Sequence, residues 1–593
     1  MLFRSVPGAA NSTIITAMRP SGERAAAALN AALTVDDGPP RGDVVVWERA
    51  CEAGTLRDLG RRLAPRRVHV LAVARPSSSL VDALPENVRI ELATTVEEVL
   101  DALLVIDEVA ALVDARVETP EAVDAALRCL AFAVAEGGTY SVVTEAADAT
   151  GAAGLLERAC AASEVAALPH QPPQGLGPDG DEVRLALQPR DETTLGDIVV
   201  HRFRKRLPHL RKLWHVDPHR VLDRRLGRGT WGAVLDSQPA RTFRSWATVH
   251  HNRVAERDRY PRELEVPQTN LVRYDLAECW PRQVARVRHA AIPETFRHFT
   301  GGHLHNVFLH WASREYGRRP GGSAVETLEG EYFFLVSEFP HHFGHVITEV
   351  LSRLWGWWRL KEQRPDLKAL VGVERGGTAP RSFVRTLLNA AGIDDDDIVP
   401  CGQPFVVEHL YAATPQFANP RFAHPELGAT WSRVGEALRE LADPPHTPYA
   451  DRIFVGRPAD LKRRCHNADA VEEEFRARGF ATLRPETMPM AEQASAFWHA
   501  SVVAGYGGSA MCNAVFSRPG AKIIINSAAY TAANEYLHSS VLGDDLHMVW
   551  AAADVEHPPG GWSADAVNAG FTVDLGDRPG VRGLRRVLDD ALG

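Results

Sequence analysis

The sequence predicts an α/β protein of several domains, and three observations support this fold class. The chain has 593 residues, which is too many for one hydrophobic core of ordinary size. Short apolar runs alternate with helical stretches rich in Ala, Leu, Glu and Arg, both near the N-terminus and after residue 450. With 45% hydrophobic and 24% charged residues, the composition is that of a globular protein.

Charge, cysteines and hydropathy exclude several classes of protein. A net charge of -10 argues against a protein that coats nucleic acid. The seven cysteines form no CxxC pair, so neither a zinc site nor a disulfide framework is indicated. The N-terminal residues lack the apolar core of a signal peptide, and no stretch has the roughly 18 apolar residues of a membrane span. We therefore expect a cytoplasmic protein that reaches membrane-linked material only at the inner face.

Residues 1–195 are predicted to form a first, Rossmann-like domain. Apolar β-type runs alternate with helical stretches, which predicts a parallel sheet covered on both faces. The predicted strands are residues 14–17, 44–47, 68–73, 88–92, 103–107 and 140–145. The stretch from Leu103 to Glu145 resembles the second half of class I methyltransferases. That family needs a glycine-rich turn after its first strand, where the backbone approaches S-adenosylmethionine.

No such turn follows the first strong apolar run of this chain. Residues 44–47 lead into Glu48 and Arg49, and the nearest glycine is Gly54. We therefore expect a degenerate domain with a structural or docking role. A bifunctional enzyme whose first domain methylates the product remains the alternative.

Residues 196–290 are predicted to be a basic linker region. Pro and Gly clusters within residues 166–195 indicate a linker or a long surface loop and a boundary near residue 195. Residues 201–228 hold ten Arg or Lys against two Asp. Such a run fits phosphates, anionic lipid headgroups at a membrane surface, or a lipid-pyrophosphate acceptor. The alternative is a solvated helix face.

A helix beginning near Phe343 carries the first candidate site. His345, Glu349 and Arg353 lie at i, i+4 and i+8, so they share one helix face. A carboxylate one turn from a histidine fixes the tautomer of the imidazole and raises its basicity, which makes His345 a candidate proton acceptor. The alternative is a structural histidine with a surface ion pair.

Residues 451–527 carry the second candidate site. They predict a β-α-β-α-β order in which Arg457 ends a strand and three basic residues follow at 462–464. Positive groups at the carboxyl end of a strand fit an anionic ligand in an α/β crevice. Gly505, Gly507 and Gly508 lie between a strand and a helical run, where glycines either cradle a phosphate or simply permit a tight turn.

Taken together, residues 325–550 resemble family 61 glycosyltransferases, which include plant xylan-decorating enzymes, protein O-linked N-acetylglucosamine transferases and bacterial polysaccharide enzymes. Three ordered motifs carry the resemblance. They include His345, Glu349, Leu351, Arg353 and Leu354; Arg457, Arg463, Arg464 and Asn467; and Glu486, Gln493, Ala500, Gly505, Gly508, Asn513, Phe516, Pro519 and Gly520. Among the departures, Gly507 replaces a frequent His, and Ile525 and Asn526 stand where a Glu often follows the last strand.

The resemblance implies a GT-B arrangement, in which two Rossmann-like halves flank a cleft. It places an acceptor-side half at 291–430 and a nucleotide-sugar-binding half at 431–593. It implies an inverting transfer from a nucleotide sugar to a glycan or lipid-linked acceptor, with no cofactor and no obligatory metal, in surface polysaccharide or glycoconjugate synthesis. The oligomeric state is not predicted.

The implied site residues have distinct roles. His345 is the base, Glu349 orients it, and Arg353 lies on the acceptor side. The implied donor-binding residues are Arg457, Arg463, Arg464, Asn467, Glu486, Gln493, Gly507, Gly508, Ser509 and Asn513.

Two alternatives to this assignment stay open. The departures at Gly507 and Asn526 also fit an inactive scaffold that binds a nucleotide sugar or a glycan. In addition, Asp394–Asp397 contains the Asp-x-Asp spacing of metal-dependent glycosyltransferases. Because these residues separate a predicted helix from a predicted strand, an exposed acidic loop is the simpler interpretation.

Overall fold

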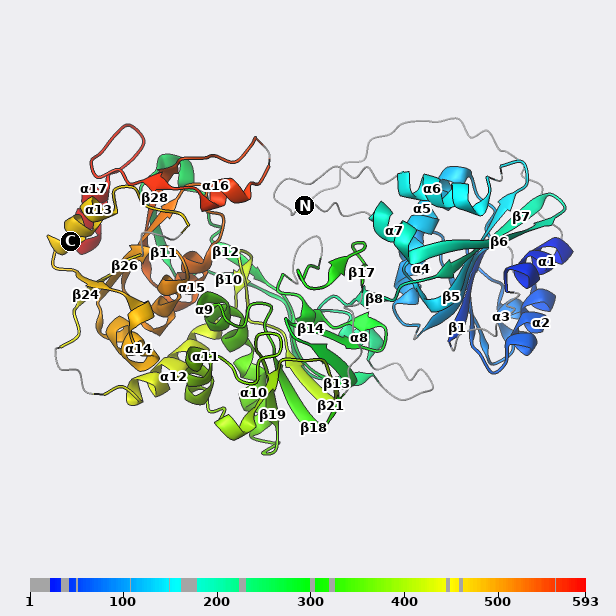
Figure 1. Ribbon diagram of the computed structural model, residues 1–593, viewed down its shortest axis with the longest axis horizontal. Helices are drawn as coiled ribbons and strands as arrows, with labels where there is room; N and C mark the ends of the chain where they lie inside the picture. Colours follow the sequence, from blue (N-terminus) through cyan, green and yellow to red (C-terminus); the bar gives the residue numbers. More distant parts are fainter. Residues whose placement is uncertain are drawn as a thin grey trace. The chain divides into compact units, whose positions relative to one another are not determined.

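The computed structural model describes residues 22–33, 42–49, 52–106, 108–148, 150–161, 179–222, 231–298, 304–318, 326–443, 448–457, 462–559 and 561–593. The fold is α/β, as predicted (Figure 1). It divides into two compact units, one of Met1–Ala162 with Val183–Leu207 and one of Ser163–Glu182 with Pro208–Gly593. The predicted strand 14–17, Asp107 and most of the Pro- and Gly-rich stretch lie outside the described residues.

The first unit is a seven-stranded sheet with helices on both faces (Figure 1). The strand order is β3-β2-β1-β4-β5-β7-β6, in which the first five strands are parallel and β7 is antiparallel to both of its neighbours. This order makes the domain Rossmann-like, with its topological switch point between β1 and β4. The strands are β1 (Asp43–Glu48), β2 (Val68–Ala72), β3 (Val88–Leu92), β4 (Val109–Asp114), β5 (Val134–Glu145), β6 (Leu187–Leu195) and β7 (Ile198–Lys205). The helices are α1 (Gly22–Ala32), α2 (Ala53–Leu63), α3 (Ser78–Asp82), α4 (Val96–Leu103), α5 (Pro120–Leu130), α6 (Ala152–Ala161) and α7 (Gly180–Ala186).

The strand predicted at 103–107 is wrong. Leu103 ends α4, and the strand is β4, which begins at Val109. Leu104 and Ile106 are buried beyond the end of that helix, and every residue of β4 is buried as well. Two adjacent apolar runs therefore share one continuous buried stretch, which periodicity alone does not divide.

Residues 196–290 are not a linker. Residues 198–205 are strand β7 of the first sheet, and β8 (His209–Lys212) to β14 (Val284–Val287) belong to the second unit. In the described part of the basic run, Lys205 and Lys212 are buried on strands and do not belong to a solvated helix face. Residues 223–228 of the run lie outside the described residues. Lys205 Nζ donates to Ala131 O at 2.8 Å and Lys212 Nζ to Ser313 O at 2.7 Å. These ammonium groups are thus satisfied inside the protein.

The second unit contains two large sheets. The first has the order β16-β17-β8-β15-β14-β13-β21-β18-β19-β20, and β9 also pairs with β13. Its strands β21, β18, β19 and β20 are parallel to one another. They are β18 (Glu326–Leu335), β19 (Lys368–Gly372), β20 (Ile398–Cys401) and β21 (Phe405–Ala413), preceded by β9 (Gly232–Gln238), β13 (Thr269–Trp280), β15 (Ala290–Ala291), β16 (His310–Trp311) and β17 (Tyr316–Arg318). Helices α8 (Pro218–Val221) and α11 (Ser382–Ala390) accompany this sheet.

The second sheet of this unit has the order β11-β28-β27-β26-β24-β25, and these six strands are parallel; β29 (Phe571–Thr572) also pairs with β28, in the antiparallel sense. The strands are β11 (Thr248–His251), β24 (Arg452–Val455), β25 (Ala481–Leu483), β26 (Val502–Tyr506), β27 (Ala521–Ser527) and β28 (Asp545–Ala553). Its helices are α13 (Ala468–Arg476), α14 (Met490–His499), α15 (Asn534–Leu542), α16 (Ala564–Asn568) and α17 (Leu584–Leu592). The unit also contains β10 (Arg241–Arg244), β12 (Glu263–Val266), β22 (Phe417–Ala418) and β23 (Phe422–Ala423).

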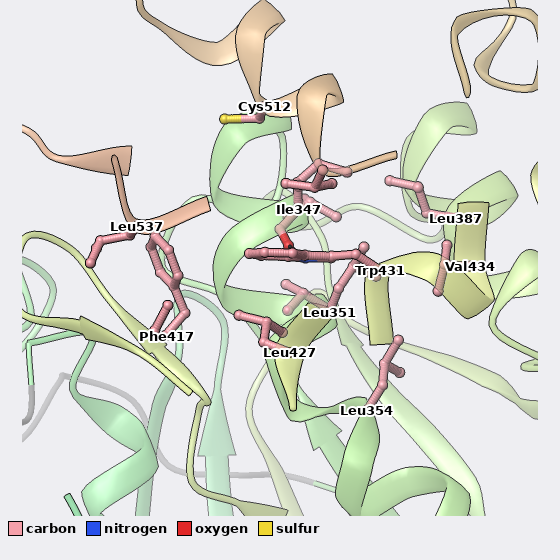
Figure 2. Packing of buried hydrophobic residues seen from close by; sticks show 14 of the residues in the cluster. Ile347, Leu351, Leu354, Leu387, Phe417, Leu427, Trp431, Val434, Cys512 and Leu537 are labelled. Atoms are coloured by element: carbon pink, nitrogen blue, oxygen red, sulfur yellow. Dashed lines mark hydrogen bonds between the residues drawn. The ribbon is translucent and has the colours of Figure 1, made fainter. Parts of the chain in front are cut away.

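One irregular helix joins the cores of the two sheets. It runs from α9 (Phe343–His345) through a π-helical turn (Val346–Val350) and a 3₁₀ turn (Leu351–Arg353) into α10 (Leu354–Lys361). Its apolar side chains share one cluster with those of α12 (Leu427–Glu440) and of the 3₁₀ helix Ser509–Phe516. Figure 2 shows Trp431 of α12 among Ile347, Leu351 and Leu427. The indole Nε1 of Trp431 donates to Ile347 O at 3.1 Å, inside the π-helical turn.

None of the helices within the described ranges combines the length and the apolar character needed to cross a membrane.

We expect Trp431→Phe to lower the free energy of unfolding by about 2–4 kcal/mol. The substitution leaves the Ile347 carbonyl without this donor and opens a cavity where a fully buried side chain stood. Urea denaturation followed by circular dichroism measures the change. Trp562→Phe is the control, because Trp562 is 42% exposed. Equal midpoints for the two variants would contradict the assigned role of Trp431.

Candidate active site

The irregular helix positions a histidine–carboxylate pair. His345 Nδ1 lies 2.7 Å from Glu349 Oε1. Burial on its own raises the pKa of Glu349, but the charge and hydrogen bond of His345 and the charge of Arg297 outweigh it, and the pKa of Glu349 is lowered. An ionised carboxylate only accepts hydrogen bonds, so His345 Nδ1 donates to Glu349 and keeps its proton whenever the imidazole holds only one. The lone pair is then on Nε2, which is the arrangement of a general base.

Arg297 and Glu338 complete this cluster, and sequence reasoning missed both. Arg297 Nη1 lies 3.4 Å from His345 Nδ1 and 3.8 Å from Glu349 Oε1, and its Nε lies 3.5 Å from Glu338 Oε2. Burial raises the pKa of Glu338, although the charge of Arg297 opposes the shift. Glu338 lies just after β18, which ends at Leu335, so its place beyond the carboxyl end of a strand was a usable signal. Nothing in the sequence indicates that Arg297 meets this helix.

Arg353 lies behind the pair rather than at a surface open to an acceptor. Its side chain is 1% exposed, and Nη1 donates to Val336 O at 3.0 Å. Burial lowers the pKa of Arg353 to about 10, and the charges of Glu349 and Glu294 act in the opposite direction. Arg353 therefore anchors the irregular helix to the end of β18.

Two arginines lie at the carboxyl end of β24, as the sequence predicts. Arg457 is half-buried and forms no hydrogen bond or ion pair with any other residue that the structure describes. Burial, with the positive charge of Arg463 as the next contribution, lowers the pKa of Arg457 to about 10. Arg463 adopts a φ of 61°, which is uncommon for a non-glycine residue, and its guanidinium lies over the ring of Tyr530. Arg464 is exposed. A half-buried guanidinium without a carboxylate partner is a natural anion site.

One backbone amide of the glycine turn, that of Gly508, is not available for the role that the sequence predicts. Gly508 adopts a φ of 149°, which favours glycine, and its N–H donates to Glu535 Oε1 at 2.9 Å. This amide, which we expected to face a diphosphate, therefore already has a carboxylate partner. Burial raises the pKa of Glu535, and its Oε2 is buried without a hydrogen-bond partner among the described residues. Glu535 lies at the start of α15 and carried no sequence signal.

Gly507 and Asn526 contact each other. A Cβ atom at position 507 would collide with the side-chain amide of Asn526, which is 3% exposed. The two residues that depart from the family motifs thus occupy one shared volume beside the turn.

Three other candidate donor-binding residues form hydrogen bonds within the protein. Gln493 Nε2 donates to Met488 O and its Oε1 accepts from Asn513 Nδ2, both at 2.9 Å. The amide of Asn467 pairs with the backbone of Val573. Glu486, in contrast, is exposed.

The pair on the irregular helix and the glycine turn come together. Gly344 packs against the turn, since an added Cβ would lie 3.4 Å from both Ser509 Oγ and Cys512 Sγ. His342 Nε2 lies 3.4 Å from Ser509 Oγ, and the rings of His342 and His345 are 4.7 Å apart. Burial, then the charge of His345, lowers the pKa of His342 to about 4, so this imidazole is neutral. A candidate base thus lies one side chain away from a candidate phosphate turn.

The acidic stretch 394–397 lies elsewhere, in the loop between α11 and β20. Asp395 forms an ion pair with Arg385, and Asp397 with Lys361 and Lys368. The interpretation as an acidic surface loop agrees with these contacts.

Comparison with known proteins assigns the family of this region. Residues 343–524 match the family model described as Glycosyltransferase 61. This range contains the His345–Glu349 pair, both arginines and the glycine turn. The predicted resemblance to family 61 glycosyltransferases is confirmed for this range of residues. No curated protein sequence matches the chain.

Solved structures similar to this chain are methyltransferases and an RNA-processing protein. The TehB-like SAM-dependent methyltransferase from Corynebacterium glutamicum is 15% identical over 31% of this chain and 88% of its own, with a TM-score of 0.19. The Methanococcus jannaschii fibrillarin pre-rRNA processing protein is 13% identical over 30% and 74%, with a TM-score of 0.21. The N-methyltransferase NodS from Bradyrhizobium japonicum is 14% identical over 31% and 95%, with a TM-score of 0.18.

We expect the free energy of unfolding of Glu535→Gln, compared with that of the wild type at the same pH, to increase as the pH rises from 5 to 8. A raised folded-state pKa means that the folded protein holds this proton more tightly than the unfolded chain, so Glu535 destabilises the fold as pH rises above the ordinary Glu pKa. Glutamine keeps an acceptor for Gly508 and does not titrate. The difference in the free energy of unfolding should grow with pH across this range, as measured by urea denaturation at several pH values. The exposed residue Glu556 supplies the control Glu556→Gln. A difference that is constant with pH would contradict the assignment.

Proposed function

We propose that this glycosyltransferase moves a sugar from a nucleotide-sugar donor to an acceptor hydroxyl, with inversion at the anomeric carbon and without a metal. The observation that carries the proposal is the placement of the His345–Glu349 pair beside the glycine turn and two arginines. The acceptor class is a glycan or a lipid-linked glycan of a surface polysaccharide or another glycoconjugate.

The proposed reaction is a single displacement. The acceptor oxygen attacks the anomeric carbon while His345 Nε2 takes the hydroxyl proton. The bond from the anomeric carbon to the phosphate oxygen breaks, and the nucleoside diphosphate leaves with that electron pair. Glu349 stabilises the imidazolium that forms, because its carboxylate accepts the Nδ1 hydrogen bond at 2.7 Å. Attack on the face opposite the leaving group gives inversion.

Arg457 and Arg463 are assigned to the departing diphosphate. Two guanidinium groups supply the positive charge that a metal ion supplies in other transferases. The raised pKa of Glu535 supports this assignment, since it favours the uncharged form of the one buried carboxyl group that touches the turn. We also assign the Ser509 hydroxyl, which points to His342, to a position between donor and acceptor.

The two sheets of the second unit support a GT-B arrangement. The irregular helix follows the carboxyl end of β18, and the arginines follow the carboxyl end of β24. In parallel α/β sheets, ligands bind at this end of the strands. Donor and acceptor would then meet between the two edges.

A second, methylating activity of the first unit is not favoured. At the switch point between β1 and β4, the guanidinium of Arg116 lies 3.2 Å from the centroid of the Trp47 ring and pairs with Asp114 at 2.7 Å. All three side chains are buried. They lie at the carboxyl ends of β1 and β4, where a cofactor binds in this fold. Bulky, buried and mutually paired side chains therefore take the place that the cofactor would need.

We expect a nucleoside diphosphate to raise the melting temperature in EDTA and to lose this effect in Arg457→Ala. A ligand at 100 times its Kd stabilises the native state by about 2.7 kcal/mol. Thermal shift against a panel of nucleoside diphosphates and nucleotide sugars measures it. Arg476→Ala is the control, because Arg476 forms its ion pair with Glu473 on the exposed surface of α13. Stabilisation that needs Mn²⁺ would overturn the metal-free proposal.

We expect His345→Ala to reduce kcat by about 100-fold or more, because a positioned general base contributes factors of about 10² to 10⁴. The thermal shift with the donor should stay at the wild-type value. Release of nucleoside diphosphate from the stabilising nucleotide sugar measures turnover. His409→Ala is the control, since His409 belongs to another His–Asp pair, with Asp275 at 2.9 Å. Near-normal turnover in His345→Ala would remove His345 as the base. Donor binding without turnover in the wild type would favour the inactive scaffold.

A further inference from the structure

A cluster of metal-ligand side chains lies outside the transferase site. His250, Asp545 and His547 each offer one ligand atom, and these atoms all lie within 4.8 Å of one another. Within the described part of the chain, no other group of three His, Cys, Asp or Glu side chains meets this criterion. The three residues come from two neighbouring strands, β11 and β28.

The sheet geometry brings these side chains together. His250 is the direct register partner of His547 in the parallel pair β11–β28. Asp545 and His547 are two residues apart on β28, so their side chains project from the same face of the sheet. The His250 and His547 rings stack with centroids 4.6 Å apart and planes 17° apart. The alignment therefore follows from backbone register, which limits the adjustment needed to bind an ion.

The polar atoms converge on the carboxylate. His250 Nε2 lies 2.8 Å from Asp545 Oδ1, and His547 Nε2 lies 3.0 Å from Asp545 Oδ2. Both imidazoles thus present the same ring nitrogen to one aspartate. Two imidazole nitrogens and one carboxylate are a ligand set suited to Zn²⁺ and to Fe, Ni or Cu ions.

Burial and charge fit an open site. The Asp545 side chain is 48% exposed and that of His250 is 42% exposed, so water can fill the remaining coordination positions. The side chain of His547 is 6% exposed, so it forms the buried side of the site. The nearby positive charge of Arg582 is paired with Asp590 at 2.8 Å.

We propose that His250, Asp545 and His547 bind one divalent transition-metal ion, with Zn²⁺ as the reference ion. The site lies at the amino end of β28, whereas the glycine turn follows the carboxyl end of β26 in the same parallel sheet. The ion thus has no part in sugar transfer. It ties β11, which comes from a distant part of the sequence, to the edge of the donor-side sheet and stabilises that attachment.

The experiment is a calorimetric titration of the full chain, freed of metal with EDTA and then dialysed, with ZnCl₂. We expect the wild type to bind one equivalent more than His250→Gln and Asp545→Asn, and Zn²⁺ to raise the melting temperature of the wild type more than that of either variant. Glutamine retains a hydrogen-bond donor for Asp545, so the variant keeps the local contact. His466→Gln is the matched control, because His466 pairs with Asp554 at 2.6 Å outside any such group of three.

A measurement on the wild type alone guards against misfolded variants. Diethyl pyrocarbonate modifies exposed histidines, and mass spectrometry locates the modified peptides. Zn²⁺ should protect His250 at least tenfold and leave His409 unaffected. Equal Zn²⁺ stoichiometry in the wild type and a folded His250→Gln, or no protection of His250, would overturn the proposal and leave a metal-free His–Asp–His hydrogen-bonded group. Neither result depends on transferase activity, so failure here is distinguishable from failure of the proposed function.

Discussion

Burial of the helix Phe343–Lys361 between two sheets is the constraint on which the rest of the second unit depends. Such a helix can keep polar side chains only where each finds a partner. Thr348 and Ser352 donate to carbonyls of the helix itself, Arg353 reaches Val336 O, and Trp431 donates into the π-helical turn from α12. Glu349 is the remaining case. Its Oε1 meets His345 and Arg297, which orients the imidazole, whereas its Oε2 is buried without a hydrogen-bond partner among the described residues.

At the donor side, the buried charge is positive, and it has no such partner of opposite charge among the described residues. Burial lowers the pKa of Arg457, and the positive charge of the nearby Arg463 adds to this shift. Within the described ranges, no carboxylate lies within ion-pair distance of Arg457. In the part of the chain that the structure describes, the positive charge at the end of β24 therefore lacks an ion-pair partner. Glu535 lies near these arginines, but it is buried, and its Oε1 accepts a hydrogen bond from the Gly508 amide. Burial raises the pKa of Glu535.

Local spacing was enough to predict the α/β class, the His345–Glu349 contact and the arginines after β24, because these depend on helix periodicity and on where strands end. Contacts between distant segments were not predictable. Arg297 reaches His345 from a loop, and Glu535 reaches Gly508 from the next helix but one. The basic run was misinterpreted for a related reason. Lys205 and Lys212 bury their stems on strands and satisfy their ammonium groups with carbonyls that only tertiary structure supplies.

The departures from the family motifs at Gly507 and Asn526 have one physical cause. The amide of Asn526 fills the space that a side chain at position 507 would need, so a larger residue at 507 would require a different side chain or orientation at 526. They count as one coupled change rather than two independent losses. A donor site decaying without function would lose its costly features first: the exposed edge of positive charge, the left-handed Arg463 and the buried acid at the turn. All three are present here. A repacked turn that retains them is better explained as an altered donor pocket than as an abandoned one, which favours transfer over passive binding.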